Sequence, residues 1–228
     1  MSDGFYLDND VVLKTCSYGA GAELVELSTT GDLAPAILAL ARFTLRSRVE
    51  RSRVLVDAQN ASAQLDAVLA QVRFLEPTPE EVDIAADFEA AATEANLSFD
   101  AGESQLVAML GARGAVALVS GDKRAAKAMS VVVPELERRL VCLEQVLHSI
   151  IARFGLEPLR SSVCREKASD RAVTNCFQCS SQQVEAPSVL QGLESYLRSL
   201  RSETGRLLVK SAGMSGAEVA QEDSVGST

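Results

Sequence analysis

Short apolar segments that alternate with helical segments are the feature that most restricts the fold of this chain. The run AVALVSG (115–121) is too short for a helix and indicates a buried strand, and helical segments stand on both sides of it. Another strand is expected in GFYLDNDVVLK and should end near Asp8. Because strands that alternate with helices favour a parallel sheet flanked by helices, residues 1–133 are expected to form an α/β domain.

One helix of this domain has a complete start signal. Thr78 is a suitable N-cap, Pro79 suits the first helical position, and Glu81 stands three residues after the cap, where it can close a capping box. The predicted buried face of this helix consists of Ile84, Phe88, Ala91 and Ala95.

After Pro134 the pattern changes to long amphipathic segments, which predict a helical extension over residues 134–210. Its expected parts are helices near 135–154 and 188–209 and an irregular, Cys-bearing connector over 155–186, followed by a disordered tail over 211–228.

Each of the two helices carries a leucine-rich stripe with a spacing that suits packing between helices. We expect the two helices to form a hairpin. Their apolar surface then has two possible uses: contact with a second copy of the chain in a homodimer, or packing on the domain of residues 1–133. The stripes comprise Leu136, Leu140, Leu143, Leu147, Ile150 and Phe154, and Leu190, Leu193, Leu197, Leu200 and Leu207.

Composition excludes several classes of protein. No apolar run among the 228 residues approaches the roughly 18–20 residues of a membrane span, and the acidic start MSDGFYLDND differs from a signal peptide, so a cytoplasmic location is expected. The formal net charge of −9 argues against a sequence-blind nucleic-acid binder. An aromatic content of only 4%, without Trp, argues against stacking platforms for single strands.

Five cysteines are an odd number for a chain without a secretion signal, so a disulfide framework is not expected. Cys176 and Cys179 have the C-x₂-C spacing of half a zinc site, and Cys164 stands twelve residues before them. A structural Zn²⁺ site and buried reduced cysteines are the two interpretations. The candidates for a fourth zinc ligand are His148, Cys142 and Asp170.

Acidic residues stand at comparable places in three segments. Asp8 ends the first strand, Asp122 follows the strand VALVS, and Glu103 lies in the first turn of a helix with Asp100 before it. In a parallel α/β sheet these positions meet at the carboxyl edge, and clustered carboxylates favour a hard cation such as Mg²⁺ or Mn²⁺. Taken singly, each residue has a simpler interpretation, as a helix cap, a turn residue or a first-turn acid.

These segments, in this order, resemble a PIN-like domain over roughly residues 4–133. YLDNDVVL resembles the opening strand of that family, DAGESQLVAML resembles its Gly-Glu segment that leads into an apolar helix, and ALVSGDKRAAKAM resembles its strand, Asp and basic helix.

The resemblance implies an α/β sandwich whose acids bind Mg²⁺ or Mn²⁺ and hydrolyse phosphodiesters, usually in RNA; many members are toxins of bacterial toxin–antitoxin pairs. It implies that Asp8, Glu103 and Asp122 are catalytic metal ligands and that Asp10 and Asp100 are close neighbours of the metal. The family usually has a further acid about forty residues into the domain.

This chain has Arg42 in that region, with Asp32 and Glu50 on either side of it. The loss of one acid implies a weaker metal site or a domain that binds without cutting, unless Asp100 takes its place. Two functions therefore stay open: a metal-dependent ribonuclease, and a PIN-like module without activity that acts as a regulatory or assembly partner.

Arginines are concentrated over residues 42–53. They are interpreted either as a solvated helix face or as a patch that holds the phosphate backbone of an RNA substrate. In the second interpretation Arg42, Arg46 and Lys123 are the candidate phosphate contacts.

Overall fold

The computed structural model describes residues 3–214 and contains, within them, a five-stranded sheet in the order β3-β2-β1-β4-β5. All four strand pairs are parallel, which confirms the predicted α/β fold. The strand order reverses between β1 and β4, and α/β sheets have their binding crevices at such a point. The strands are β1 (Phe5–Leu7), β2 (Ala36–Leu38), β3 (Arg73–Leu75), β4 (Ala117–Ser120) and β5 (Leu140–Cys142).

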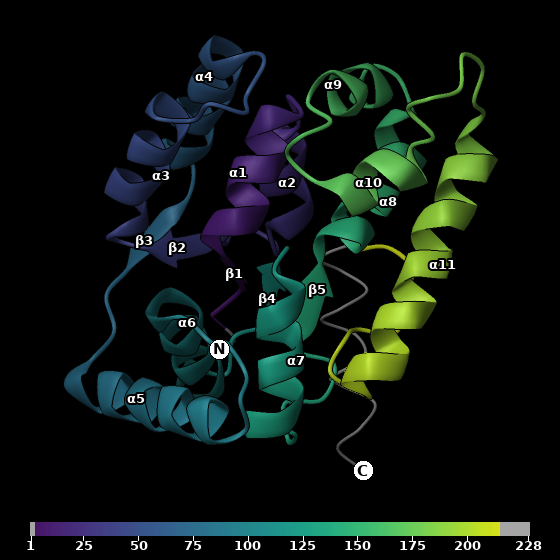
Figure 1. The fold of residues 1–228 in the computed structure, drawn as a ribbon. Coiled ribbons are helices and arrows are strands. Elements are labelled where there is room, and N and C mark those ends of the chain that lie inside the picture. The colour runs from purple at the N-terminus through teal and green to yellow at the C-terminus, as the bar shows by residue number, and fades with distance from the viewer. Residues whose placement is uncertain (1–2, 215–228) are drawn as a thin grey trace.

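Helices cover the sheet on two sides (Figure 1). In that view α1–α4 and α8–α10 lie above the strands and α5–α7 lie below them, while α11 runs along the right and contacts both α8 and α7. The helices are α1 (Asn9–Ser17), α2 (Gly21–Ser28), α3 (Ala41–Glu50), α4 (Ala58–Leu69), α5 (Pro79–Glu94), α6 (Ala101–Arg113), α7 (Lys123–Val132), α8 (Leu143–Phe154), α9 (Leu159–Arg165), α10 (Arg171–Cys176) and α11 (Ala186–Thr204).

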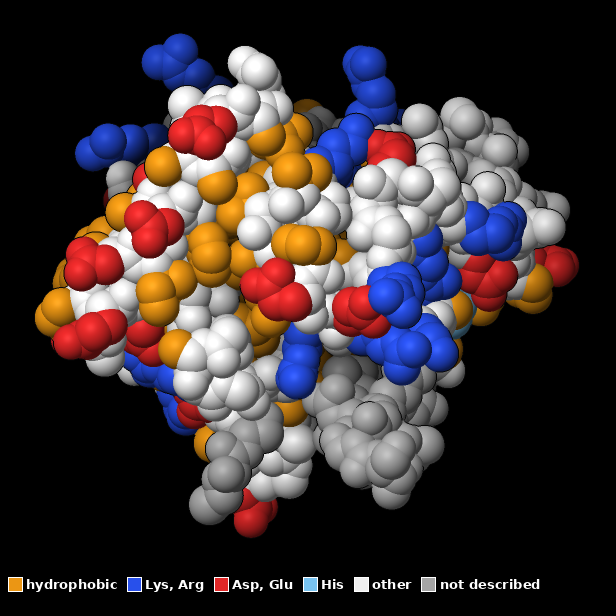
Figure 2. All heavy atoms as spheres, turned by 90° about the horizontal axis from the view of Figure 1, so that it is seen from below, with side chains coloured by type: hydrophobic (Ala, Val, Ile, Leu, Met, Phe, Trp, Pro, Cys, Tyr) orange, Lys and Arg blue, Asp and Glu red, His pale blue; other side chains and the backbone are white. Residues whose placement is uncertain are grey.

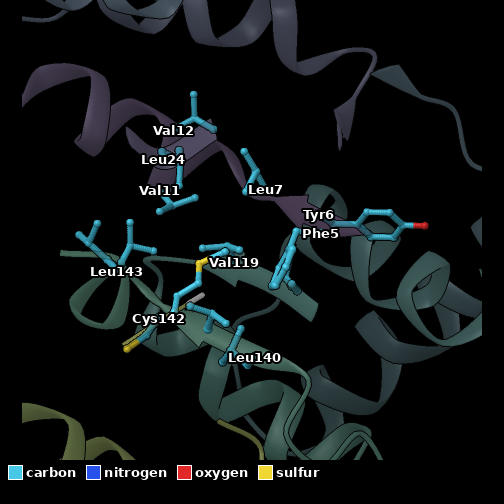
Figure 3. Close-up of a cluster of buried hydrophobic side chains, with 14 of the residues drawn as sticks. Phe5, Tyr6, Leu7, Val11, Val12, Leu24, Val119, Leu140, Cys142 and Leu143 are labelled. Carbon is cyan, nitrogen blue, oxygen red and sulfur yellow. The ribbon is translucent and has the colours of Figure 1, made fainter. Parts of the chain in front are cut away.

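The three central strands, β2, β1 and β4, are buried along their whole length, so apolar residues fill both faces of the sheet. Phe5 and Tyr6 of β1 are fully buried although they point to opposite faces. Figure 3 shows Leu7, Val119 and Leu140 in one cluster with residues from the starts of α1 and α8. Full burial of a large apolar side chain stabilises by roughly 1.5–3 kcal/mol, so this cluster fixes the strand ends that carry the acidic residues.

Helix α5 starts as predicted, with Thr78 as N-cap and a capping box to Glu81. Of its predicted buried face, Phe88 is half-buried and packs against the core, but the expectation is wrong for the exposed Ile84, Ala91 and Ala95. The buried positions are Glu81, Ala85 and Ala92, whereas Ile84 is 39% exposed. Helix α5 packs on α6, where Ala85 and Ala92 are small enough for close approach and Glu81 is buried in an ion pair with Arg113 of α6. Figure 2, a view from below Figure 1, shows hydrophobic and acidic side chains interspersed on this side of the molecule.

The predicted domain boundary at residue 133 is also wrong, since the sheet continues beyond it. Leu140–Cys142 forms the edge strand β5, with Leu140 opposite Leu118 of β4, and helix α8 begins only at Leu143. The spacing of the leucines continues a helical pattern through this strand, but Arg138 adopts a left-handed φ of 56° that a helix cannot contain. Pairing with β4 thus overrides the helical pattern.

Helices α8 and α11 contact each other as expected, with α9 and α10 between them in the chain. Leu143 and Leu147 of α8 and Leu193 and Leu197 of α11 belong to the same continuous core as the sheet. The stripes therefore pack within one chain, and the homodimer stays a prediction. No helix within the described residues is long and apolar enough to span a membrane.

The predicted tail 211–228 falls largely on residues 215–228, which lie outside the described part of the chain. Its first residues are ordered: Met214 is buried, and the amide of Gln145 donates a 2.8 Å hydrogen bond to the carbonyl of Ser211.

The connector differs from the predicted zinc site and from the expectation of reduced cysteines. Cys164 and Cys179 are joined in a disulfide across a sequence separation of 15 residues, while Cys176 is free. The disulfide links α9 to the turn that follows α10. It uses two of the three cysteine sulfur atoms that were predicted as zinc ligands.

The disulfide should contribute to the free energy of unfolding, and this contribution can be measured. We expect Cys164→Ser/Cys179→Ser to lower the free energy of unfolding by about 3 kcal/mol, because a closed loop of this length restricts the unfolded chain. Chemical denaturation with and without dithiothreitol measures it, and the reductant should reproduce the loss in the parent chain. Cys176→Ser is the control and should keep the response to reductant. A parent chain that is insensitive to reductant but destabilised by a zinc chelator would contradict the disulfide.

Candidate functional site

Asp8 lies at the carboxyl end of β1 and is the N-cap of α1. One carboxylate oxygen accepts a 2.6 Å bond from the Asn9 backbone N–H, and the other accepts a 3.3 Å bond from the N–H of Asp10 and a 3.1 Å bond from the Ser120 hydroxyl. The residue is only 6% exposed. Its carboxylate is therefore fixed in a buried position at the edge of the sheet.

Ser120 links this carboxylate to the next acid. The Ser120 hydroxyl accepts a 3.1 Å bond from the Asp122 backbone N–H while it donates to Asp8. Asp122 caps α7 through the N–H of Arg124 at 2.8 Å and forms an exposed ion pair with that guanidinium, also at 2.8 Å. Sequence reasoning missed Ser120, although its place two residues before Asp122 at a strand end was a usable signal.

Glu103 reaches the same edge from the first turn of α6. The Asp100 carboxylate accepts bonds from the N–H groups of Gly102 and Glu103, and the Glu103 carboxylate accepts from the Asp100 N–H at 3.3 Å. Glu103 is 6% exposed, so this capping box holds a nearly buried carboxylate.

The electrostatics show that these carboxylates act on one another. Burial raises the pKa of Asp8 to about 6, with a further contribution from the charge of Asp10. Burial, followed by the charges of Asp8, Asp100 and Asp122, raises the pKa of Glu103 to about 8. Within residues 3–214, no Lys, Arg or His forms an ion pair with Asp8, Glu103 or Asp100.

Asp122 behaves differently because it is more exposed and has a partner. Burial alone would raise its pKa, but the hydrogen bonds and the charge of Arg124 outweigh that effect and lower the pKa. Asp122 therefore stays ionised to lower pH than Asp8 and Glu103, the two acids whose pKa values burial raises.

The site fits a hard cation by its chemistry. Two buried carboxylates without a cationic partner lie beside an ionised one, and a divalent ion would neutralise them. As the side chains stand, no group of three or more Asp, Glu, His or Cys residues within the described part of the chain is placed so that it could hold a metal ion.

A groove of about 670 Å³ runs from the acidic edge along α3. Asn9 and Asp100 line it at the acidic end, and Leu40, Phe43 and Arg48 line it along α3. Leu40 and Phe43 are 69% and 60% exposed, so this surface is apolar as well as basic.

The three predicted phosphate contacts lie in different environments. Arg42 stacks on the rings of Phe43 and Phe74, at 4.7 and 5.5 Å from their centroids, beside this groove. Arg46 instead pairs with Asp66 on α4. The expectation for Lys123 is wrong, because its ammonium lies 3.0 Å from the buried Glu144 carboxylate and over the ring of Tyr196.

Comparison with known proteins gives no relative: no family model, curated protein or solved structure matches this chain. The chemistry of the acidic edge and the groove beside it are therefore the basis for a functional proposal.

Proposed function

We propose that this protein is a divalent-metal-dependent phosphodiesterase of PIN-like type that acts on RNA. The observation that supports it is the convergence of Asp8 and Glu103, buried and without a cationic partner, beside the ionised Asp122 at the reversal of strand order. A protein gains nothing in stability from such an arrangement, because each buried carboxylate without a partner costs free energy. Sites that perform chemistry carry this kind of cost.

In this proposal Asp8, Glu103 and Asp122 hold Mg²⁺ or Mn²⁺, and the ion supplies Lewis acidity and an activated water. Ser120 keeps Asp8 in place through its hydroxyl. The groove along α3 holds the RNA strand, with a base against Phe43 and the backbone near Arg42 and Arg48.

A specific observation also favours the second candidate, a module that binds RNA or protein without cutting. Helix α3 starts with Ala41 and Arg42 and has no acid in its first turn, so the further acid of the family is missing there. Asp100 lines the same groove and is the residue that could replace it.

The experiment is cleavage of a fluorescent single-stranded RNA by the purified chain with Mg²⁺, Mn²⁺ or EDTA. We expect cleavage that needs either metal and is lost in Glu103→Gln, where Gln keeps the capping box but removes the charge. Metal-dependent binding of the RNA without cleavage would favour the second candidate. Cleavage that persists in EDTA or in Glu103→Gln would refute the proposed site.

A further inference from the structure

Asp10, unlike Asp8 and Glu103, already has a cation. The Lys14 ammonium lies 2.7 Å from the Asp10 carboxylate, one turn along α1. Asp10 is close enough to the acidic edge for its charge to raise the pKa of Asp8. It is thus a member of the acidic cluster whose charge is compensated within the chain.

The backbone of the strand–helix turn leaves room for this pair. A Cβ atom at Gly121 would lie 2.3 Å from an Asp10 carboxylate oxygen and 3.5 Å from the Lys14 ammonium. The turn that presents Asp122 therefore packs directly on the Asp10 carboxylate, and only glycine permits this approach.

The helical extension anchors the ammonium from the other side. Asp170 is 9% exposed in its side chain, and one oxygen accepts a 2.8 Å bond from Lys14 while the other caps α10. Burial alone would lower the pKa of Lys14, but the two carboxylates outweigh that effect and raise it, so Lys14 stays charged. Asp170 lies in the loop that the Cys164–Cys179 disulfide closes.

We propose that Lys14 is a built-in cation that neutralises Asp10, so that the acidic edge binds one divalent ion where its carboxylates could otherwise bind two. Asp170 is the positioning residue that holds the ammonium there. This inference rests on the proposed metal site, which consists of Asp8, Glu103 and Asp122. Two-metal sites need carboxylates free to serve ions about 4 Å apart, and the ion pair withdraws Asp10 from that set.

The test is the number of Mn²⁺ ions bound per folded chain, measured by equilibrium dialysis with electron paramagnetic resonance detection at pH 8. The parent chain should bind one ion. Lys14→Met should bind a second ion through the released Asp10, and Lys14→Met/Asp10→Asn should return to one. Asp170→Asn keeps the cap of α10 but removes the carboxylate charge that positions the Lys14 ammonium, so the pairing of Lys14 with Asp10 should weaken and a second, weaker ion should appear.

Lys127→Met is the matched control, because it removes the same charge from a half-exposed ion pair with Glu203 on the protein surface, and it should bind one ion. If Lys14→Met does not fold, Asp10→Asn decides: the proposal requires one ion with an affinity within about twofold of the parent, against a loss of tenfold or more in Glu103→Gln.

The outcomes separate the two proposals. A parent chain that binds no Mn²⁺ refutes the proposed function and this inference with it. A parent chain that binds two ions leaves the metal site in place and overturns the role of Lys14. Folded Lys14→Met and Asp170→Asn chains that both still bind one ion overturn it as well.

Discussion

Asp8→Asn is expected to reduce metal-dependent RNA cleavage by about 100-fold or more while it stabilises the metal-free protein. Loss of activity follows because an amide cannot supply the negative charge that a hard cation requires of its ligand. The gain in stability follows because the substitution removes a buried charge without a cationic partner. The two effects have opposite directions, so general damage to the fold cannot imitate them.

The structure explains why this variant should fold. An Asn at position 8 can still accept the hydrogen bond from the Asn9 backbone through its carbonyl oxygen, while its amide nitrogen would face the Ser120 hydroxyl as a donor, and Asn is as good an N-cap as Asp. Cleavage rates and a thermal melt in EDTA at pH 8 measure the two effects. Asp66→Asn makes the same charge change in an exposed ion pair with Arg46 and should alter neither property by more than a small amount. A variant that cuts at the parent rate would remove Asp8 from the metal site.

The sequence was informative where signals are local. The apolar run before Asp122 and the capping box at Thr78 depend on residues within one turn or one strand, and both elements are present where they were expected. Asp8 and Asp122 could be placed together because adjacent parallel strands end at the same edge. The hypothesis of their convergence needed only the strand ends and not the details of packing.

The features that were missed depend on contacts between distant segments. The pairing of Leu140 with Leu118 is decided by the sheet, so the leucine spacing alone suggested a longer helix. The contact between Lys14 and Asp170 joins residues 156 positions apart, and no local pattern marks it. The disulfide depends on the fold of the connector in the same way, since the spacing of Cys176 and Cys179 indicated a different partner.

The role of a helix cap and the role of a metal ligand, which were treated as alternatives for each acid, are compatible in the structure. Asp100 uses one oxygen for both of its capping bonds, and Asp8 divides its bonds between two oxygens. A carboxylate can therefore cap the N-terminus of a helix and still offer a lone pair to an ion. The capping role explains the position of each acid, and the uncompensated burial of Asp8 and Glu103 is the part that capping leaves unexplained.

The last prediction concerns pH and follows from that burial. For Asp8 the ordinary pKa of 3.8 rises to about 6 in the folded chain, and for Glu103 the ordinary pKa of 4.5 rises to about 8. The folded state thus binds protons more tightly than the unfolded state, and this contribution is fully present below pH 4 and lost as the pH rises toward 8. Each pKa unit corresponds to about 1.4 kcal/mol, so the loss should reach at least roughly 3 kcal/mol.

Chemical denaturation in EDTA between pH 5 and pH 8 measures this loss. Acids with a lowered pKa, such as Asp170 and Glu81, change protonation below their ordinary values of 3.8 and 4.5 and do not disturb this range. Mn²⁺ should restore stability at pH 8, by about 2.7 kcal/mol at a hundred times its Kd, and have little effect at pH 5, because it competes with the protons. Glu103→Gln should flatten the pH dependence and remove the response to Mn²⁺. A metal-free chain that becomes more stable from pH 5 to pH 8 would show that Asp8 and Glu103 ionise without cost, and the main physical reason for a cation at this edge would be gone.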